Sequence, residues 1–420
     1  MKIITLTEEQ FTNFAKSHKY KSFYQTSSYA KLMKLDGYDY HLLGFLSNSN
    51  ELIGATMVLF KKVFLNYKMA YAPFGFLVDY TNNDLVEEMT ERLKRLLLKQ
   101  RFVFLKINPR IECSRRDQEG NIISYNPEIN DIMEILQKNN YIHFGFNNYF
   151  ETDKPRWNAI LKLTASNDKL YSNLNKNVRN KINKARKCGI EVKQATKEED
   201  LEIFYEFVKR KHSRNLKYYQ KLIKEFGTDA KIYFAVQNTE KFLKISKDNY
   251  EYELSKNEFI NNKLQEASSK HENIDKIISQ KMESDKIAAT SQKHLIDATQ
   301  LFASHPEDII IGAILVIEYE GEENLIIEGF DQNYRDYDPN YLLKWDLIEK
   351  WNKEGKVAFN MNGIVGEFKE QNKYSGLNEL KLGYNADAVE YIGEFELVIN
   401  KTVYNIYKRR LEKKKKKSAK

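Results

Sequence analysis

Two groups of cationic side chains are the residues of this sequence best suited to chemistry. The first is Lys381, alone in the stretch "GLNELKLGYNADAVEYIGEF" (376–395), whose apolar and aromatic residues predict half-buried strands. An ammonium group fixed in such surroundings can stabilise negative charge. Alternatively, its stem packs on a sheet while its head reaches water. The residues alone leave both interpretations open.

The second group lies in the polar segment 170–189, which we expect to be helical between strands 157–163 and 190–195. Its basic residues lie mostly three to five positions apart, so several share one helical face: Arg179, Lys181, Lys184, Arg186 and Lys187. Such a face fits a phosphate backbone, and it equally fits an ordinary solvated helix surface.

The charge balance points to a polyanionic partner. The 420 residues carry a formal net charge of +8, and the excess is concentrated in the tail, residues 406–420. This tail has the composition of a disordered segment that rests on anionic lipid or RNA, or that only keeps the protein soluble.

Several classes of site lack support. The two cysteines are distant in sequence and the seven histidines are scattered, so we expect no metal. The motifs GxGxxG, GxxxxGK[ST] and GxSxG are absent, and the nearest match to a coenzyme A pyrophosphate loop has Glu191 where a small residue belongs. We therefore expect no cofactor. No segment resembles a signal peptide or a membrane span, which predicts a cytoplasmic protein.

The elements that must position these residues form a weak internal repeat. Strands at 40–46, 51–63 and 69–80, a helix at 84–100 and a strand at 102–109 are followed later by the same order: 231–237, 309–320, 324–331, a helix at 340–355 and a strand at 357–363. This order predicts two α/β units, each a mixed sheet covered by helices.

Residues 228–305 contain neither glycine nor proline, which predicts long helices inserted in the second unit. Two runs with a spacing of seven predict an antiparallel hairpin: Leu243, Tyr250, Asn257 and Leu264, then Ile274, Lys281, Ala288, Leu295 and Phe302. Residues 269–272 have the spacing of a capping box that begins the second helix.

A family resemblance follows from the order of six features: "FYQTSSYAKLMK", "YAPFGFLVDY", "NKINKARKCGIEV", the hairpin, "FNMNGIVGEF" and "LKLGYNADAVEYIGEF". Together they resemble the FemABX family of peptidoglycan bridge-forming aminoacyltransferases, from about residue 3 to residue 405. The resemblance implies an α/β (α+β) fold with two N-acetyltransferase-like (GNAT-like) domains, at 1–152 and 153–400. A coiled-coil arm at 237–305 interrupts the second domain, and the basic tail occupies 406–420.

The resemblance also implies a function. Such enzymes transfer an amino acid, most often glycine, with alanine and serine as alternatives, from aminoacyl-tRNA to an amine of lipid II or of a UDP-linked muropeptide precursor. Peripheral contact with the inner membrane face is compatible with this role, and the oligomeric state stays open. The alternatives are an acyltransferase acting on another amine, and a non-catalytic adaptor bound to RNA or membrane.

Individual residues carry over from the resemblance. Lys381 matches a lysine that stabilises the negative charge formed on the ester carbonyl, although Leu380 replaces the usual phenylalanine. Lys31 matches a lysine that binds the phosphate or sugar region of the precursor. Arg214 matches an arginine on its pyrophosphate, and Tyr218 matches a tyrosine that lines that site. Asn108 stands where relatives commonly have aspartate, which removes acid-base chemistry and leaves hydrogen bonding to the substrate. Phe74 and Glu328 are further departures from the family pattern.

Overall fold

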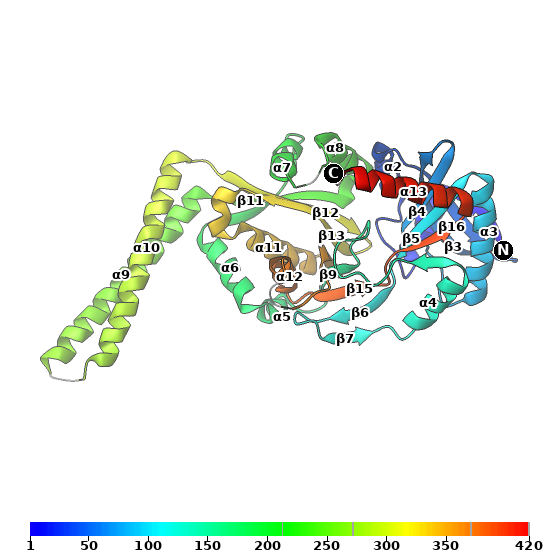
Figure 1. Cartoon of the computed structure of the whole chain (residues 1–420). Helices are drawn as coiled ribbons and strands as arrows, with labels where there is room; N and C mark the ends of the chain where they lie inside the picture. The colour runs from blue at the N-terminus through cyan, green and yellow to red at the C-terminus, as the bar shows by residue number, and fades with distance from the viewer. Residues whose placement is uncertain (212, 271–272, 370–371, 419–420) are drawn as a thin grey trace.

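The first half of the chain folds around a mixed sheet (Figure 1). The computed structural model describes residues 1–211, 213–270, 273–369 and 372–418, with side chains as far as residue 413. The elements of this half are β1 (Lys2–Thr5), α1 (Glu8–Ser17), α2 (Ser27–Met33), η1 (Lys34–Asp36), β2 (Asp39–Leu46), β3 (Leu52–Phe64), β4 (Tyr67–Phe74), α3 (Asn83–Lys99), β5 (Phe102–Pro109), β6 (Glu112–Arg116), β7 (Ile122–Tyr125), α4 (Ile129–Lys138) and β8 (Tyr141–His143).

The second half adds a larger sheet and the longest helices. Its elements are β9 (Trp157–Lys162), α5 (Asn167–Asn173), α6 (Lys176–Lys187), β10 (Ile190–Gln194), α7 (Asp200–Val208), α8 (Leu216–Phe226), η2 (Gly227–Asp229), β11 (Ala230–Gln237), α9 (Thr239–Ser269), α10 (Asp275–Ser304), β12 (Ile309–Tyr319), β13 (Glu322–Phe330), η3 (Gln332–Tyr337), α11 (Pro339–Lys353), β14 (Ala358–Ile364), α12 (Ser375–Leu382), β15 (Asp387–Tyr391), β16 (Phe395–Val398) and α13 (Lys401–Ser418).

The two halves repeat one topology, as the sequence predicts. In the first, β2, β3 and β4 are antiparallel neighbours, and α3 crosses over to β5, which pairs with β4 in parallel. In the second, β11, β12 and β13 are antiparallel neighbours, and α11 crosses over to β14, which pairs with β13 in parallel. Each crossover helix covers one face of its sheet because a parallel connection must pass over that face.

Strands cross between the halves in both directions. The seven-stranded sheet has the order β1-β2-β3-β4-β5-β16-β8, and the nine-stranded sheet has the order β10-β11-β12-β13-β14-β9-β15-β6-β7. The late strand β16 thus completes the first sheet, whereas β6 and β7 extend the second. The division at residues 152/153 therefore stays a proposal about domains.

A shared apolar core joins the two units. Alternate side chains of the first sheet pack under α1 and α2, and alternate side chains of the second pack under α7 and α8. These two layers form one cluster, in which α2 lies against α8. The opposite faces carry separate cores under α3 and α4 and under α5, α6 and α11. The residues between α2 and α8 are consequently fixed by both units.

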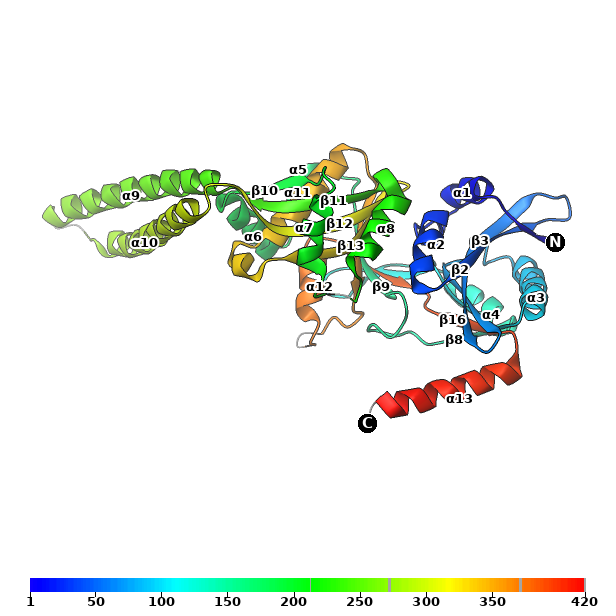
Figure 2. The same ribbon diagram turned by 90° about the horizontal axis from the view of Figure 1, so that it is seen from above.

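The arm is an antiparallel pair of helices that projects from the second sheet, away from the N-terminal end (Figures 1 and 2). Its helices α9 and α10 have 31 and 30 residues, which is a length of about 45 Å each. On α10, the buried residues that face the partner helix are small or polar and lie seven positions apart: Ser284, Ser291 and Ala298. Part of the capping box expected at 269–272 lies outside the described residues.

Two local predictions are wrong. Residues 376–382, expected as strand, belong to the short helix α12, and strand begins only at β15. The tail, expected to be disordered, continues helix α13 to Ser418. The first turns of α13 pack Val403, Tyr404 and Tyr407 against Phe104 and its neighbours, which anchors the helix to the first unit. Figure 2 shows α13 beside the first unit, running back toward the second.

No helix within the described residues is both long and apolar enough to span a bilayer.

Candidate active site

The contact between α2 and α8 brings three sequence-predicted residues to one region. Arg214 precedes α8 and pairs with Asp36 of η1, and its guanidinium lies 4.3 Å from the centre of the Tyr218 ring. The hydrogen bond to Asp36 raises the pKa of Arg214, which keeps it charged. Lys31 of α2 forms a 2.7 Å ion pair with Glu8 on the outer side of this helix. All three side chains are partly exposed and can reach a ligand.

Asn108, the next-to-last residue of β5, makes hydrogen bonds within the protein. Its side-chain oxygen accepts hydrogen bonds from the Tyr71 hydroxyl and the backbone N–H of Phe74, both at 3.1 Å. The residue is buried and lines a small cavity together with Lys154 and Tyr391. The Asn108 amide oxygen therefore holds the end of β4 beside that cavity, and its amide nitrogen is available to donate a hydrogen bond to a substrate.

Lys381 is buried on α12, and its ammonium points inward. Lys381 is only 8% exposed, and its Nζ donates a 2.7 Å hydrogen bond to the carbonyl oxygen of Gly363. Burial lowers the pKa of Lys381 to about 8, an effect opposed by the charge of Glu328 and reinforced by that of Lys344. Lys344 in turn forms a 2.5 Å ion pair with Glu328.

The Gly363 carbonyl lies at an irregularity of strand β14. The pairing of β14 with β9 shifts between Asn360 and Gly363, and Asn362 has a φ of +64°, a left-handed conformation that asparagine adopts more readily than most residues. A Cβ atom at Gly363 would lie 2.7 Å from Cγ of Pro155, so the backbone here abuts the segment between the units. This bulge connects the surroundings of Lys381 to the junction.

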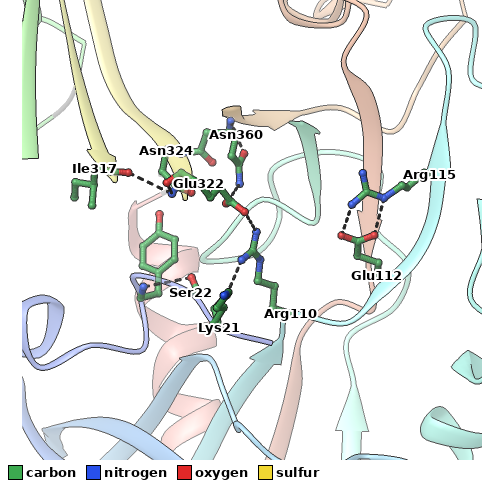
Figure 3. A network of polar contacts seen from close by, with 11 residues as sticks. Lys21, Ser22, Arg110, Glu112, Arg115, Ile317, Glu322, Asn324 and Asn360 are labelled. Carbon is green, nitrogen blue, oxygen red and sulfur yellow. Dashed lines mark hydrogen bonds and ion pairs between the residues drawn. The ribbon is translucent and has the colours of Figure 1, made fainter. Parts of the chain in front are cut away.

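The junction between the units holds a polar network that the sequence did not predict (Figure 3). Arg110, just after β5, forms a 2.5 Å ion pair with Glu322 at the start of β13 and donates a 2.6 Å hydrogen bond to the carbonyl of Lys21. Asn360 donates to the other oxygen of Glu322 at 3.2 Å. Burial opposes the charge of Arg110, but Glu322 outweighs it and raises the pKa of the guanidinium.

Two small cavities flank this network. One, of about 20 Å³, is lined by side chains of both units, including Phe74, Arg110, Lys154, Glu322 and Tyr391. The other, of about 10 Å³, shares Phe74, Lys154 and Tyr391. Each volume suits about one water molecule. Lys154 is common to both cavities, and its flanking sequence "TDKPRW" has no periodicity that would have identified it.

A larger cavity of about 510 Å³ lies between α12 and the start of α6. It is lined by Asn175 and Asn177 of the α6 turn, Tyr341, and Asn378 and Glu379 of α12. Lys381 does not line it, because its ammonium turns toward Gly363 instead.

The basic residues of α6 mostly contact the protein itself. Lys184 pairs with Asp338 at 3.4 Å, Arg186 reaches Glu349 at 3.3 Å, Lys181 donates to the hydroxyl of Tyr341 at 3.0 Å, and Arg179 donates to a backbone carbonyl. Lys187 makes no hydrogen bond or ion pair within the described residues. RNA binding by this face stays a prediction, with much of its charge already balanced by α11. No group of three metal-ligating side chains is present within the described part of the chain.

Comparisons with known proteins agree over nearly the whole length. A family model described as the FemAB family matches residues 6–412. The aminoacyltransferase FemA of Staphylococcus epidermidis is 28% identical over 417 residues, covering 97% of this chain and 98% of the relative. FemA of Staphylococcus aureus is 26% identical over 415 residues, covering 97% of each chain. A crystal structure of FemX has the same fold, with a TM-score of 0.74 at 20% identity, covering 97% of this chain and 99% of that one.

Proposed function

This chain belongs to the FemAB family, and from that premise we propose that it transfers an amino acid from aminoacyl-tRNA to an amine of a peptidoglycan precursor. It is an aminoacyltransferase, as are its full-length relatives named FemA. The family match over residues 6–412 is the observation that carries the proposal. The acceptor in this proposal is the stem peptide or growing bridge of lipid II or of a UDP-linked muropeptide.

The reaction requires a nucleophilic amine and stabilisation of an oxyanion. The amine nitrogen attacks the ester carbonyl carbon, the bond to the ribose oxygen breaks, and that oxygen leaves with a proton as a hydroxyl group. A lysine amine has a reference pKa near 10.4 and must lose its proton first. We propose substrate-assisted proton transfer through the ribose hydroxyl, with the protein contributing orientation.

Lys381 is our candidate for the charge that stabilises the oxyanion. Its ammonium is already desolvated and held by one carbonyl group, that of Gly363. A cation fixed in a site of low polarity is oriented before the reaction begins, so it stabilises charge that develops in the transition state. When the substrate binds, the Lys381 ammonium would release the Gly363 carbonyl and donate a hydrogen bond to the ester carbonyl oxygen instead.

For the acceptor we propose the surface between α2 and α8. Arg214 and Lys31 offer cationic groups to phosphate oxygens, Tyr218 offers an aromatic wall, and Asn108 lies deeper at the junction. Both Arg214 and Lys31 are held by carboxylates of the first unit, Asp36 and Glu8. These pairs fix the side chains and must loosen or share their cation when a phosphate binds.

One assay tests the proposal. Purified protein is offered glycyl-, alanyl- and seryl-tRNA with lipid-linked and UDP-linked precursors of increasing branch length, and product masses are read. We expect a precursor extended by one residue with at least one donor, glycine being the first choice, and no product with uncharged tRNA. Failure of all donors to extend any precursor that the protein binds would contradict the proposal.

A further inference from the structure

Lys154 occupies the connection between the two units. It lies between β8 and β9, next to Pro155, which packs against Gly363 of the β14 bulge. Its side chain lines both small cavities of the junction, and the residue is partly exposed. The segment thus places one lysine where the first unit, the second unit and the surroundings of Lys381 meet.

The contacts of Lys154 are aromatic. Nζ lies 3.8 Å from the centre of the Tyr24 ring and 3.1 Å from the Tyr29 hydroxyl oxygen, to which it donates a hydrogen bond. Tyr24 stacks on Phe74 with ring centres 5.1 Å apart. Among the described residues, the ammonium has no other hydrogen-bond acceptor and no carboxylate within 4.0 Å. Its remaining N–H groups are open to a ligand.

Two other partly buried cations of this region are paired with carboxylates. Arg110 pairs with Glu322, and Lys106 lies 2.6 Å from Glu394 and 2.9 Å from Asp153. These carboxylates outweigh burial and raise the pKa of Lys106, whereas burial lowers the pKa of Lys154 to about 7. An ammonium that is removed from water and has no direct ion pair among the described residues destabilises the unliganded protein, although the nearby charge of Asp153 partly offsets this, and functional sites are where such groups cluster.

A second cation lies close enough to act on the first. Burial and the positive charge of Arg214 lower the pKa of Lys154, whereas the carboxylates of Asp153 and Asp36 act in the opposite direction. The charge of Arg214 also acts on Tyr29. Arg214 comes from the second unit and Tyr29 from the first, so groups of both units lie near Lys154. An anion bound beside Lys154 would reduce the repulsion between the two cations and give the Lys154 ammonium a direct ionic partner.

We infer that Lys154 binds an anionic group, a phosphate or a carboxylate, of the acceptor substrate, an inference that rests on the function proposed above. The aromatic rings of Tyr24, Tyr29 and Phe74 form the wall beside that group, and Arg214 binds the same ligand from the second unit. Lys154 thereby fixes the acceptor at the junction. The next residue, Pro155, packs against Gly363, whose carbonyl binds Lys381, so the bound acceptor lies near the proposed oxyanion-stabilising charge.

Binding measurements on the full chain test this inference. Lys154→Met keeps the apolar stem and removes the charge, and Lys154→Arg keeps the charge. The probes are a UDP-linked muropeptide, UDP alone and the free stem peptide, titrated calorimetrically. We expect Lys154→Met to bind the UDP-linked muropeptide about 10- to 100-fold more weakly and Lys154→Arg to restore most of the affinity. Equal loss for UDP alone identifies a phosphate, and loss confined to probes that contain the peptide identifies a carboxylate.

Matched controls separate binding from folding. Lys169→Met changes an exposed lysine of α5 and should leave all affinities unchanged. If Lys154→Met lowers the melting temperature, Lys154→Gln and Lys154→Arg decide: weak binding by the first and normal binding by the second support the inference. Wild-type affinity in folded Lys154→Met or Lys154→Gln overturns it while leaving the proposed function intact. Failure of the wild-type protein to bind any probe overturns the proposed acceptor and this inference together.

Discussion

Lys381 and Lys344 are buried cations of the same neighbourhood with different partners. Lys344 forms an ion pair with Glu328, whereas the hydrogen bond of Lys381 among the described residues goes to the carbonyl of Gly363. A carbonyl contact is readily exchanged for a reacting oxygen, and an ion pair is not. This difference is the physical reason to place the oxyanion-stabilising charge on Lys381.

Replacing Lys381 should therefore affect the chemical step. We expect Lys381→Met to lower kcat by about 10²- to 10³-fold, as does the loss of one oxyanion donor elsewhere, with little change in KM for the acceptor. In the wild-type enzyme the contribution of this charge should be lost as pH rises through about 8, because burial has lowered the pKa of Lys381 to that value. Single-turnover rates against pH measure both effects. In Lys381→Arg the loss should move to higher pH, and a wild-type rate in Lys381→Met would refute the assignment.

Glu323 makes stability depend on pH in the opposite sense to a paired carboxylate. It is buried on β13, and neither of its oxygens has a hydrogen-bond partner among the described residues. Burial raises its pKa from the reference 4.5 to about 7, despite the nearby charges of Lys231 and Lys356. The folded state therefore binds the proton more tightly, and the stability this provides below pH 4.5 is lost as pH rises to 7.

Glu323→Gln should remove this dependence. We expect the variant to be more stable than the wild type by about 2 to 3 kcal/mol at pH 8 and nearly equal to it at pH 4.5, since one pKa unit is about 1.4 kcal/mol. Urea unfolding at several pH values provides the measurement. Glu307→Gln, on the exposed connection before β12, is the matched control and should change little. Equal stabilities of Glu323→Gln and wild type at pH 8 would show that the buried carboxylate has partners.

The arm depends on polar contacts across its seam. Asn257 of α9 donates hydrogen bonds to Ser284 at 3.2 Å and to Asp285 at 2.8 Å, both on α10. Asn257→Ala should cost the arm about 1 to 2 kcal/mol, because these two hydrogen bonds and the 3.2 Å bond that the Asn257 oxygen accepts from Lys281 are lost, and their partners are left less satisfied. Hydrogen exchange should accelerate at amides of α9 and α10 and stay unchanged in both sheets. Asn262→Ala, exposed on α9, should have no effect, and faster exchange in the sheets would contradict a locally folded arm.

The elements that the sequence predicted well are the long periodic ones. Alternating strands and the crossover helices α3 and α11 have patterns that burial on one face imposes, and the structure confirms them. Helix α12 was missed because Leu377, Leu380 and Leu382 allow a strand pattern over so short a segment. Its conformation is set by distant contacts, such as the bonds between the Asn378 side chain and the backbone of Val365.

The candidate site was only partly accessible from the sequence for a related reason. Lys31, Arg214, Tyr218, Asn108 and Lys381 were named by resemblance. Lys154 and the Arg110–Glu322 pair were not, because their chemistry exists only once distant segments meet: Arg110 and Glu322 are 212 positions apart, and Lys154 and Tyr29 are 125 apart. No local spacing encodes such a juxtaposition.

The two units are joined by an extensive interface. They exchange strands in both directions, share the core under α2 and α8, and are linked by the Arg110–Glu322 ion pair. Separation of the units would expose that core and leave a buried charge on each side without its partner. Binding groups contributed by both halves, such as Lys154 and Arg214, are therefore held at a fixed relative position, which reduces the entropy lost when a substrate binds.

Helix α13 is the element best suited to orient the protein on an anionic membrane surface. Its first turns are anchored to the first unit by Val403, Tyr404 and Tyr407, and Arg410 lies 3.7 Å from the centre of the Phe64 ring. Its sequence then continues with lysine at residues 413–417. Exposed apolar side chains lie on the same unit, at Ile142 on the edge strand β8 and at Ile406. We propose that this side of the molecule rests on anionic lipid when the acceptor is lipid-linked.

Neutralising the lysines should then separate two activities. In a variant with glutamine in place of all the lysines at 413–417, we expect binding to vesicles containing anionic lipid to fall at least 100-fold. Each lysine near such a surface contributes about 1 kcal/mol. Turnover of a UDP-linked acceptor in solution should be unchanged, because the lysines lie beyond the anchored turns, whereas turnover of a lipid-linked acceptor in vesicles should fall. Arginine at the same five positions keeps the charge and should keep both activities. Vesicle co-sedimentation and product mass measure the two quantities, and undiminished vesicle binding by the glutamine variant would assign membrane contact, if any, to another face.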